Sequence, residues 1–550
     1  MYLMFRSGED WRAVKLDIPE YCPPKTEAAP EIDLTSVPSL WQPVIEAPIL
    51  APAVSQRPAS KFTPSKYQQA FFDFISKGEG SAVVEAVAGS GKTTTIVQAL
   101  SLIPATKRTI FMAFNRNIAD ELKSRVPTNV QASTFHSIGF KSWMRRYPRC
   151  KVDEQKVIKI IREQLSEAEN GQYGMFVSQL VNLAKQRGIL ALIPDTTEEW
   201  SSIIEHFDLH LDGVEEDYEI IEAEAVGKAR AILQESNNRS EQSVDFNDMI
   251  YMPILRHLAF DLYDFVFIDE AQDTNNIRRA MAKAMLTKTG RLVAVGDSRQ
   301  AIYGFTGADS DSMDLIQRDM AASKFPLSIS YRCSKAVVEV AKHFVPEIES
   351  TETAPSGIVQ STTFKTTPPR NTDAILCRNT APLVQLAYSF IGNGTACKIL
   401  GRDIGRNLQK FVDTMKANSI DELSEKLNQY AGEETARLMK QDKAARAQSV
   451  SDKVDCLDII ISHLDPANRT IAALMSYIDQ LFGDNVKDML TLSTVHKSKG
   501  LEWTRVYIYQ PELMPSKHAT QPWQQAQETN LIYVATTRAR EELYYVKENK

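Results

Sequence analysis

The sequence predicts an α/β fold with two parallel sheets, each interrupted by a mainly helical insertion. From Ser65 onward, short apolar segments of strand length alternate with amphipathic runs of helix length, the pattern of parallel strands joined by crossover helices. A small-residue turn ending in Gly-Lys-Thr follows the first of these strands and leads directly into a helical run. The chain has 550 residues, 43% hydrophobic and 24% charged, so it is globular and long enough for three or four domains.

Proline marks the first boundary. Ten of the 25 prolines precede Lys66, and residues 19–64 show no sustained helical or strand period, so residues 1–64 are predicted to be an extended arm or linker. Within the arm, the first sixteen residues can form a small hairpin around a turn at Ser7–Asp10. A partly disordered tail and an element that binds a partner protein are equally good interpretations of the arm.

Two sets of strands and two insertions follow. The strands predicted for the first sheet are residues 81–87, 108–114, 130–135, 264–270 and 291–297. The stretch from Gly139 to about Val244 is mainly helical and too long for a crossover, so it is predicted to be an inserted domain. The strands predicted for the second sheet are residues 373–378, 396–401, 490–495, 505–510 and 542–546, interrupted by a charged helical stretch from Arg402 to about Asn485.

Charge is distributed unevenly. The formal net charge of −7 argues by itself against a generally basic nucleic-acid coat, but residues 195–249 carry −13 and the rest of the chain +6. Residues 122–152 hold seven Lys or Arg and no acid, interleaved with Phe135, Phe140, Trp143 and Tyr147. This combination suits a groove that tracks a nucleic-acid strand. A solvated helix face with core aromatics is the alternative.

No segment approaches the ~18 apolar residues needed to cross a bilayer, and the N-terminus lacks the apolar core of a secretion signal. We therefore expect a cytoplasmic, nucleoid-associated protein, or a nuclear one in a eukaryote. The six cysteines lie at least twenty residues apart, so the sequence has no CxxC ligand pair and favours reduced thiols without a structural metal.

The turn after the first strand predicts a nucleotide site. In such a turn, backbone N–H groups and the helix N-terminus cradle phosphates. Lys92 would neutralise the β and γ phosphates and Thr93 would ligate Mg²⁺, while Ala86 stands where the general pattern asks for glycine. The residues predicted to bind the nucleotide here are Ala88, Gly89, Ser90, Gly91, Lys92, Thr93 and Thr94.

Adjacent carboxylates end the fourth predicted strand. Asp269 would hold the magnesium shell, and Glu270 would orient and deprotonate the attacking water. A lone Asp-Glu pair is weak evidence, but together with the phosphate loop it predicts hydrolysis of a nucleoside triphosphate.

The ordered motifs resemble those of UvrD/Rep-type helicases of superfamily 1, subfamily A, from about Lys66 to the C-terminus. The segments that carry the resemblance, in chain order, are TPSKYQQAFFDF, AVAGSGKTT, FNRNIADEL, STFHS, VDFNDMI, FIDEAQD, GDSRQAIYGFTGA, ISYRCS, LSTVHKSKGLEW and NLIYVATTRARE. The family also carries alanine at the position of Ala86.

The resemblance implies two RecA-like P-loop NTPase lobes with accessory domains. The first lobe would be residues 65–138 and 245–305, the second residues 306–401 and 486–550. Residues 139–244 would correspond to domain 1B, and residues 402–485 to a domain 2B shorter than is usual in the family.

The resemblance also assigns roles around ATP and Mg²⁺. Gln68 would read the adenine edge, with Gln69 as an alternative register, and Tyr331 would stack on the base. Glu502 would lie near the ribose. Gln300, Arg332 and Arg538 would reach the γ-phosphate, the last as a second arginine finger.

Single-stranded DNA and single-strand/duplex junctions are the implied substrate, and RNA is less favoured. The residues expected to contact DNA or couple it to the lobes are Phe114, Asn115, Thr134, His136, Trp143, Tyr303, Phe305, Thr494, His496 and Lys499. The family often has arginine where Thr306 stands, which puts one contact in question. Lys499 stands where the branch of opposite polarity usually shows glutamine, which favours 3′ to 5′ movement.

The resulting expectation is an ATP-dependent 3′–5′ DNA helicase or translocase acting in replication, repair or recombination. The short second insertion favours an alternative, a translocase that displaces proteins or recombinase filaments and unwinds weakly. A third hypothesis is a nucleotide-gated scaffold whose arm docks a replication or repair protein. The presence of Lys92, Asp269, Glu270 and Arg538 disfavours the scaffold, because a decayed ATPase normally loses one of them.

Overall fold

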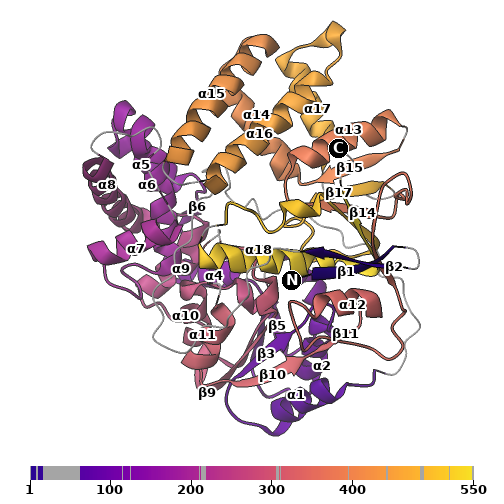
Figure 1. The fold of residues 1–550 in the computed structure, drawn as a ribbon. Helices are drawn as coiled ribbons and strands as arrows, with labels where there is room; N and C mark the ends of the chain where they lie inside the picture. The colour runs from indigo at the N-terminus through magenta and orange to yellow at the C-terminus, as the bar shows by residue number, and fades with distance from the viewer. Residues whose placement is uncertain are drawn as a thin grey trace. The chain divides into compact units, whose positions relative to one another are not determined.

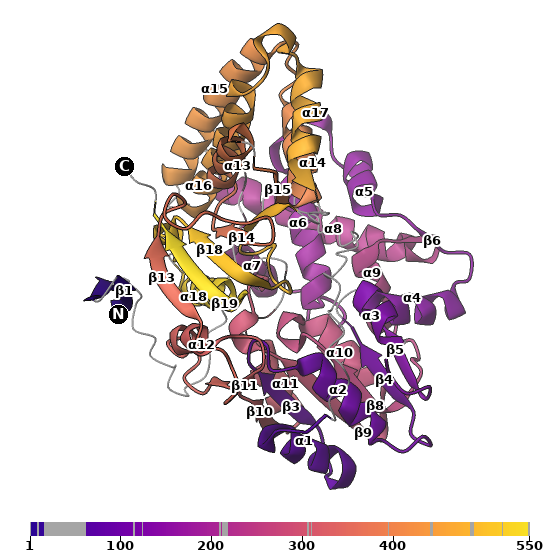
Figure 2. The same cartoon turned by 90° about the vertical axis from the view of Figure 1, so that its right-hand side faces the viewer.

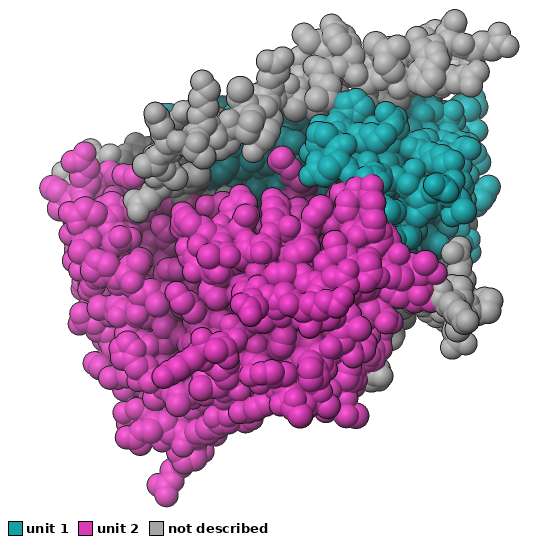
Figure 3. Space-filling view, turned by 90° about the horizontal axis from the view of Figure 1, so that it is seen from below, with its two compact units in different colours: residues 1–25, 40–61, 329–550 teal, residues 26–39, 62–328 magenta. Residues whose placement is uncertain are grey.

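The computed structural model describes residues 2–7, 10–15, 62–113, 116–123, 125–207, 209, 211, 218–304, 307, 309, 311–393, 395–440, 444–483, 489–519 and 521–547. Its chain divides into two compact units, drawn in teal and magenta in Figure 3. Unit 2 contains residues 62–328, and unit 1 contains residues 329–550 together with the N-terminal hairpin.

A six-stranded parallel sheet forms the centre of unit 2 (Figure 1). Its strands, in spatial order, are β10 (Ser323–Leu327), β3 (Ala82–Ala86), β9 (Leu286–Gly296), β8 (Tyr263–Ile268), β4 (Thr109–Met112) and β5 (Val130–Ser133). Every pairing is parallel, so the carboxyl ends of all six strands meet at one edge. The five strands predicted for this sheet are present, and β10 is an additional one.

Helices precede or follow the strands of this sheet along the chain. They are α1 (Lys66–Lys77), α2 (Lys92–Ser101), α3 (Arg116–Lys123), α4 (Phe135–Arg146), α9 (Phe246–Leu255), α10 (Asn276–Ala284) and α11 (Ser312–Asp319). Ser65 caps α1 in a reciprocal capping box with Gln68, and Phe71, Phe72 and Ile75 of that helix are buried. Gly139 allows α4 to cross α9 closely, because a Cβ there would lie 2.0 Å from the Met249 carbonyl oxygen.

The predicted first insertion is mainly helical, as expected. It contains α5 (Lys156–Gln164), α6 (Glu167–Arg187), α7 (Thr197–Phe207) and α8 (Tyr218–Asn238), with the short paired strands β6 (Lys151–Val152) and β7 (Ser243–Val244) where the chain leaves and returns. Good helix signals delimit α6, since Ser166 and Glu169 form a capping box and Gly188 ends the helix in the left-handed conformation.

Unit 1 contains a seven-stranded parallel sheet. Its strands, in spatial order, are β13 (Ile358–Thr362), β19 (Ala539–Val546), β18 (Trp503–Tyr509), β14 (Ala374–Cys377), β17 (Leu490–Thr494), β15 (Cys397–Leu400) and β16 (Phe482–Gly483). The five predicted strands are again present, and β13 and β16 extend the two edges. Two further short strands, β11 (Ile329–Ser330) and β12 (Glu349–Ser350), pair with each other.

Helices complete unit 1. They are α12 (Lys335–Ala341), α13 (Ala381–Gly392), α14 (Arg402–Thr414), α15 (Ile420–Lys440), α16 (Ala444–Ser462), α17 (Ile471–Leu481) and α18 (Pro522–Thr536). The described part of the second predicted insertion is mainly helical and contains β16 near its end, and α15 and α16 run side by side (Figure 2). One apolar core joins α13, α14, α15, α16 and α17 to β14, β15 and β17.

Two sequence expectations about the boundaries can be compared with the structure. The predicted division between the lobes at residues 305 and 306 falls inside unit 2, because α11 and β10 follow it and β10 pairs with β3. The predicted N-terminal hairpin is confirmed: β1 (Tyr2–Ser7) and β2 (Asp10–Lys15) pair antiparallel, with Ser7 opposite Asp10. Among the described residues, no helix is both long and apolar enough to span a membrane.

Candidate nucleotide and strand sites

The turn between β3 and α2 has the geometry of a phosphate-binding loop. Gly89 and Gly91 have φ values of 73° and 76°, in the left-handed region where a side chain would be strained, and Gly91 is the N-cap of α2. Ala88 is buried at the start of this turn. The Ser90 hydroxyl is buried without a hydrogen-bond partner among the described residues. An orphaned hydroxyl beside a helix N-terminus fits an anionic ligand such as a nucleotide phosphate.

Lys92 connects this loop to the end of β8. Its Nζ lies 2.9 Å and 3.0 Å from the two carboxylate oxygens of Glu270, and Gln272 donates to the same carboxylate at 2.5 Å. Burial alone would lower the pKa of Lys92, but the charges of Glu270, Asp269 and Asp297 outweigh it and raise the pKa. The ammonium therefore stays charged, and a nucleotide phosphate would compete with Glu270 for it.

Asp269 has the chemistry of a metal-binding carboxylate. It is 7% exposed and accepts a hydrogen bond from the Glu270 backbone N–H at 2.9 Å. Burial and the neighbouring Glu270 charge raise the pKa of Asp269 to about 7, so the protonated and ionised forms are similarly populated at neutral pH and an added cation would favour the ionised one. Thr93 lies half-buried in the first turn of α2, whereas Thr94 is exposed.

No group of three or more His, Cys, Asp or Glu side chains that could hold a metal ion occurs in the described part of the chain. Mg²⁺ is commonly bound by one or two carboxylates together with substrate phosphates. Asp269 and Thr93 thus fit a Mg²⁺ ion that arrives with a nucleotide, and they do not form a site for a free ion.

Gln300 belongs to a second acidic group at the same sheet edge. Its Nε2 donates to the Asp297 carboxylate at 2.6 Å. Burial raises the pKa of Asp297 to about 6. Asp297 follows β9, which pairs with β3, so Gln300 lies at the carboxyl edge of the sheet beside the strand that precedes the phosphate loop.

Gln68 is fully engaged within unit 2. Its Oε1 accepts from the Ser65 backbone N–H at 2.9 Å, and its Nε2 donates to Thr95 at 2.8 Å. Gln69 is exposed and donates to Asp73 at 3.2 Å. Gln68, which contacts the helix after the phosphate loop, therefore has the better position for an adenine, but it would exchange an existing bond to read one.

A groove of about 390 Å³ lies where α3 faces the end of β5 and the start of α4. Its lining residues are Ala119, Asp120, Lys123, Ala132, Ser133, Thr134 and Ser137. Thr134 is the N-cap of α4 and accepts from the Ser137 backbone N–H at 3.2 Å. A helix N-terminus and three hydroxyls suit the phosphates of a nucleic-acid strand, whereas Lys123 pairs with Asp120 at 2.6 Å and would have to exchange that partner.

The structure corrects the role expected for Trp143. Its side chain is 0% exposed, and its indole N–H donates to the Ser240 carbonyl at 3.2 Å, so Trp143 is a core residue of unit 2 rather than a stacking platform. Phe135 is also buried. Lys141 and Arg145 both pair with Asp261, at 3.0 Å and 2.7 Å, so part of the basic stretch is neutralised.

In unit 1, the arginines predicted to reach the γ-phosphate contact other protein groups. Arg332 pairs with Glu502 at 2.5 Å. Arg538 is 1% exposed and donates to the carbonyls of Val534 and Leu501 at 3.0 Å and 2.9 Å, and burial followed by the charge of Arg332 lowers its pKa to about 10. Tyr331 is 51% exposed, which leaves its ring accessible for stacking.

The remaining predicted strand residues differ in exposure. Thr494 is buried at the end of β17, and His496 and Lys499 are half-buried in the turn that follows. Burial, followed by the charges of Arg378, Lys497 and Lys499, lowers the pKa of His496 well below its ordinary value. His136 and Tyr303 are half-buried in unit 2. Four positions of the sequence prediction lie outside the described residues: Phe114, Asn115, Phe305, and Thr306, where the family often has arginine.

One strand candidate was missed by the sequence reasoning. Phe246 is 46% exposed at the start of α9, and its ring meets that of His136 edge-on, with centroids 6.1 Å apart. An exposed aromatic beside a predicted strand-binding histidine is a platform for a base. Its position in VDFNDMI was visible in the sequence, but its exposure was not.

Comparison with known proteins agrees with this geometry. The family model for the UvrD/REP helicase N-terminal domain matches residues 68–321, and that for the UvrD-like helicase C-terminal domain matches residues 406–550. A probable DNA helicase II homolog of Mycoplasma pneumoniae is 24% identical over 306 residues, which cover 51% of this chain and 42% of that protein. The ATP-dependent DNA helicase PcrA of Staphylococcus aureus is 25% identical over 316 residues, covering 52% of this chain and 40% of PcrA. The matched regions thus span less than half the length of these relatives.

Proposed function

Because the chain belongs to the UvrD/Rep family of superfamily 1A helicases, we propose that it is an ATP-dependent DNA helicase that moves 3′ to 5′ along a single strand. The observation that carries the proposal is the ion pair between Lys92 and Glu270, which joins the phosphate loop to the end of β8. Lys92, a cation that can bind phosphate, contacts Glu270, a base that can deprotonate water, and hydrolysis of a nucleoside triphosphate requires both groups at one site.

The ion pair also supplies a mechanism for keeping the base inactive without nucleotide. While Lys92 contacts both oxygens of Glu270, the carboxylate is occupied and a poor proton acceptor. A triphosphate in the loop would attract Lys92 and meet the orphaned Ser90 hydroxyl. Glu270 would then be free to orient and deprotonate the attacking water.

Asp269 and Thr93 would hold a Mg²⁺ ion at the same edge, which, when bound, neutralises charge on the β and γ phosphates. Because its pKa is raised to about 7, Asp269 would give up its remaining proton when it takes up a cation. Gln300 would meet the γ-phosphate after exchanging its bond to Asp297. Arg332 and Arg538 remain the proposed γ-phosphate contacts from unit 1, and both would exchange partners there.

The strand would follow the groove at the start of α4. Lys123, Thr134 and Ser137 offer phosphate contacts, and Phe246 with His136 offers a surface for a base. These contacts read backbone charge and base faces, so we expect binding without sequence preference.

ATPase and unwinding assays on 3′-tailed, 5′-tailed and blunt DNA test the proposal. We expect ATP turnover that single-stranded DNA stimulates and unwinding only of the 3′-tailed duplex. Lys92→Ala should abolish turnover, whereas Lys77→Ala, whose side chain is 81% exposed on α1, should not. Turnover that DNA does not stimulate would refute the proposed function, and preference for a 5′ tail would refute the polarity.

A further inference from the structure

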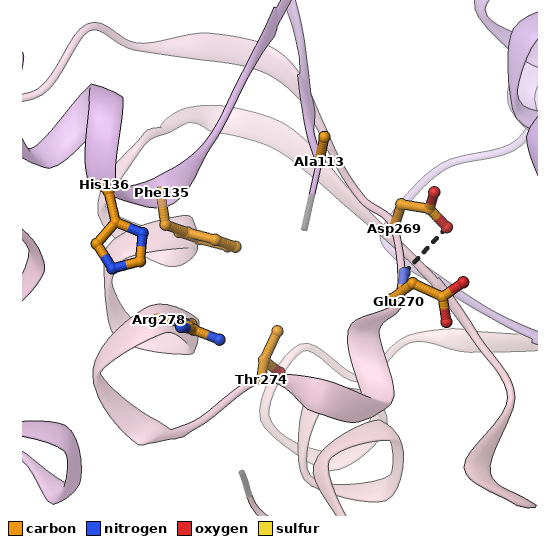
Figure 4. Close-up of a pocket in the computed structure, with 7 residues that line it drawn as sticks. All are labelled: Ala113, Phe135, His136, Asp269, Glu270, Thr274 and Arg278. Atoms are coloured by element: carbon orange, nitrogen blue, oxygen red, sulfur yellow. Dashed lines mark hydrogen bonds between the residues drawn. The ribbon is translucent and has the colours of Figure 1, made fainter. Parts of the chain in front are cut away.

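A small pocket in unit 2 joins the predicted strand site to the catalytic carboxylates. It is lined by Ala113, Phe135, His136, Asp269, Glu270, Thr274 and Arg278 (Figure 4). The pocket therefore brings together the end of β4, the first turn of α4, the end of β8 and the start of α10. The Arg278 side chain points into the space between His136 and Thr274.

Arg278 has few acceptors for its five N–H groups. Its Nη1 donates to the Asp273 carbonyl at 3.3 Å, and its Nε has no hydrogen-bond partner. Burial lowers the pKa of Arg278 and the charge of Asp273 opposes that lowering, so the guanidinium remains charged at neutral pH. In the described residues it forms no ion pair, whereas the next residue, Arg279, contacts Asp309 at 2.5 Å. A charged guanidinium whose Nε has no acceptor in the described part of the chain can bind a further anionic partner.

Arg278 is also the cation of this pocket. Burial and the positive charge of Arg278 lower the pKa of His136 to about 3, so the imidazole is neutral at physiological pH. His136 and Phe135 belong to the first turn of α4, whose N-terminus carries partial positive charge. On the other side of the same turn, Thr134 and Ser137 line the groove proposed for the strand.

We propose that Arg278 binds a backbone phosphate of the single strand beside His136 and is a further strand-binding residue of unit 2. This inference rests on the proposed helicase function. The pocket interior measures about 10 Å³, close to the space of one water molecule, so the phosphate would lie at its opening. Arg278 is half-buried, so its side chain is not wholly closed off from solvent. Because Asp269 and Glu270 line the same pocket, their negative charge would repel a phosphate from its interior, which is a second reason for the phosphate to lie at the opening.

The test is the salt dependence of binding to a fluorescent oligothymidine, measured with the full chain as wild type, Arg278→Gln and Arg279→Gln. Each phosphate contact to a single strand contributes about −0.7 to the slope of log affinity against log salt. We expect Arg278→Gln to flatten the slope by about 0.7, so that its binding defect shrinks about 2.6-fold between 50 and 200 mM salt. Arg279→Gln should keep the wild-type slope, because Arg279 already has an acidic partner.

ATPase assays separate this role from a nucleotide contact. For Arg278→Gln, the DNA concentration that gives half-maximal stimulation should rise, while basal turnover and KM for ATP stay at the wild-type values. Arg278→Met, which keeps the apolar stem, should show the same flattened slope and replaces the glutamine variant if that one fails to fold.

An unchanged slope in Arg278→Gln or Arg278→Met would overturn the inference, and a lower melting temperature with that unchanged slope would make Arg278 structural. A raised KM for ATP with unaltered DNA binding would place the anion on the nucleotide and also overturn it. If the wild-type protein neither binds DNA nor shows DNA-stimulated ATP turnover, the proposed function itself is refuted. If the wild-type protein does both and the Arg278 variants bind DNA with the wild-type salt dependence, only the role of Arg278 is refuted.

Discussion

A buried ionic cluster fastens the first insertion to the helix before the catalytic strand, and Asp248→Asn should break it. Asp248 contacts Lys156 at 2.6 Å and Lys185 at 2.7 Å, while Lys185 also contacts Asp245 at 2.6 Å. Asp245 and Asp248 form the capping box of α9, and the two lysines come from α5 and α6. The side chains of Asp248 and Lys185 are both 0% exposed.

The expected loss follows from that burial. Removing one partner of a buried ion pair costs about 3–5 kcal/mol, because it leaves the opposite charge desolvated and unpaired. In Asp248→Asn, Lys156 would lose its acidic partner and Lys185 would keep only Asp245. At roughly 2–4 °C per kcal/mol, the melting temperature of unit 2 should fall by roughly 6–20 °C.

Thermal unfolding followed by circular dichroism, with limited proteolysis to identify the unit that opens first, measures this effect. The double variant Asp248→Asn with Lys156→Met should recover part of the loss, because it removes one unpaired charge and keeps the packing volume. A control, Lys159→Met, removes an exposed lysine that pairs with Asp153 and should change the midpoint little. Unfolding of Asp248→Asn at the wild-type midpoint would refute the reasoning.

Three further predictions concern the site. Glu270→Gln should keep ATP binding but lower kcat by about 10²–10⁴, because it removes the base; single-turnover hydrolysis measures this, and near wild-type turnover would contradict it. The pKa of Asp269 is near 7 in the folded chain and lower in the unfolded chain, so between about pH 4 and 7 the Asp269 proton is kept mainly by the folded chain. The free energy of unfolding therefore falls as the pH rises across that window. The apparent Mg²⁺ affinity of the ATPase should accordingly rise up to about tenfold per pH unit below 7 and level above it; a flat titration would contradict this. Phe246→Ala should weaken strand binding by about 1–3 kcal/mol, because its exposed ring is lost as a stacking surface. Trp143→Phe should lower the stability of the fold without changing the affinity of the folded protein for the strand, because Trp143 is buried. Equal losses of strand affinity in the two variants would contradict these roles.

The sequence predicted what depends on local pattern. Period and composition placed ten strands correctly, because a parallel strand buried on both faces is a short apolar run between turns. The phosphate loop and Asp269-Glu270 were predictable for a related reason, since each follows a strand at the edge where carboxyl ends meet. The contact between Lys92 and Glu270, 178 positions apart, follows from that shared edge.

Features that depend on tertiary contacts could not be predicted from the sequence pattern. β10 has Pro326 within it and a partly exposed burial pattern, so its membership of the first sheet appears only through its pairing with β3. Trp143 and Phe246 occur in equally suggestive aromatic contexts, yet one is wholly buried and the other nearly half exposed. Neither composition nor motif spacing distinguishes them, because the packing of α4 against α9 decides which ring reaches solvent.

The pairing of charged side chains likewise depends on tertiary contacts that the sequence pattern does not show. Counting along the chain makes residues 122–152 basic and residues 195–249 acidic, but partners come from elsewhere: Asp261 neutralises Lys141 and Arg145, and Asp245 and Asp248 of the acidic stretch are buried against lysines. Local charge excess is therefore a poor guide to where a strand binds, because paired charges release few counterions when DNA arrives. A cation without an acidic partner is the better guide. By that criterion Arg278, which was not among the predicted strand-binding residues, outranks Lys141 and Arg145 of α4, which are both paired with Asp261.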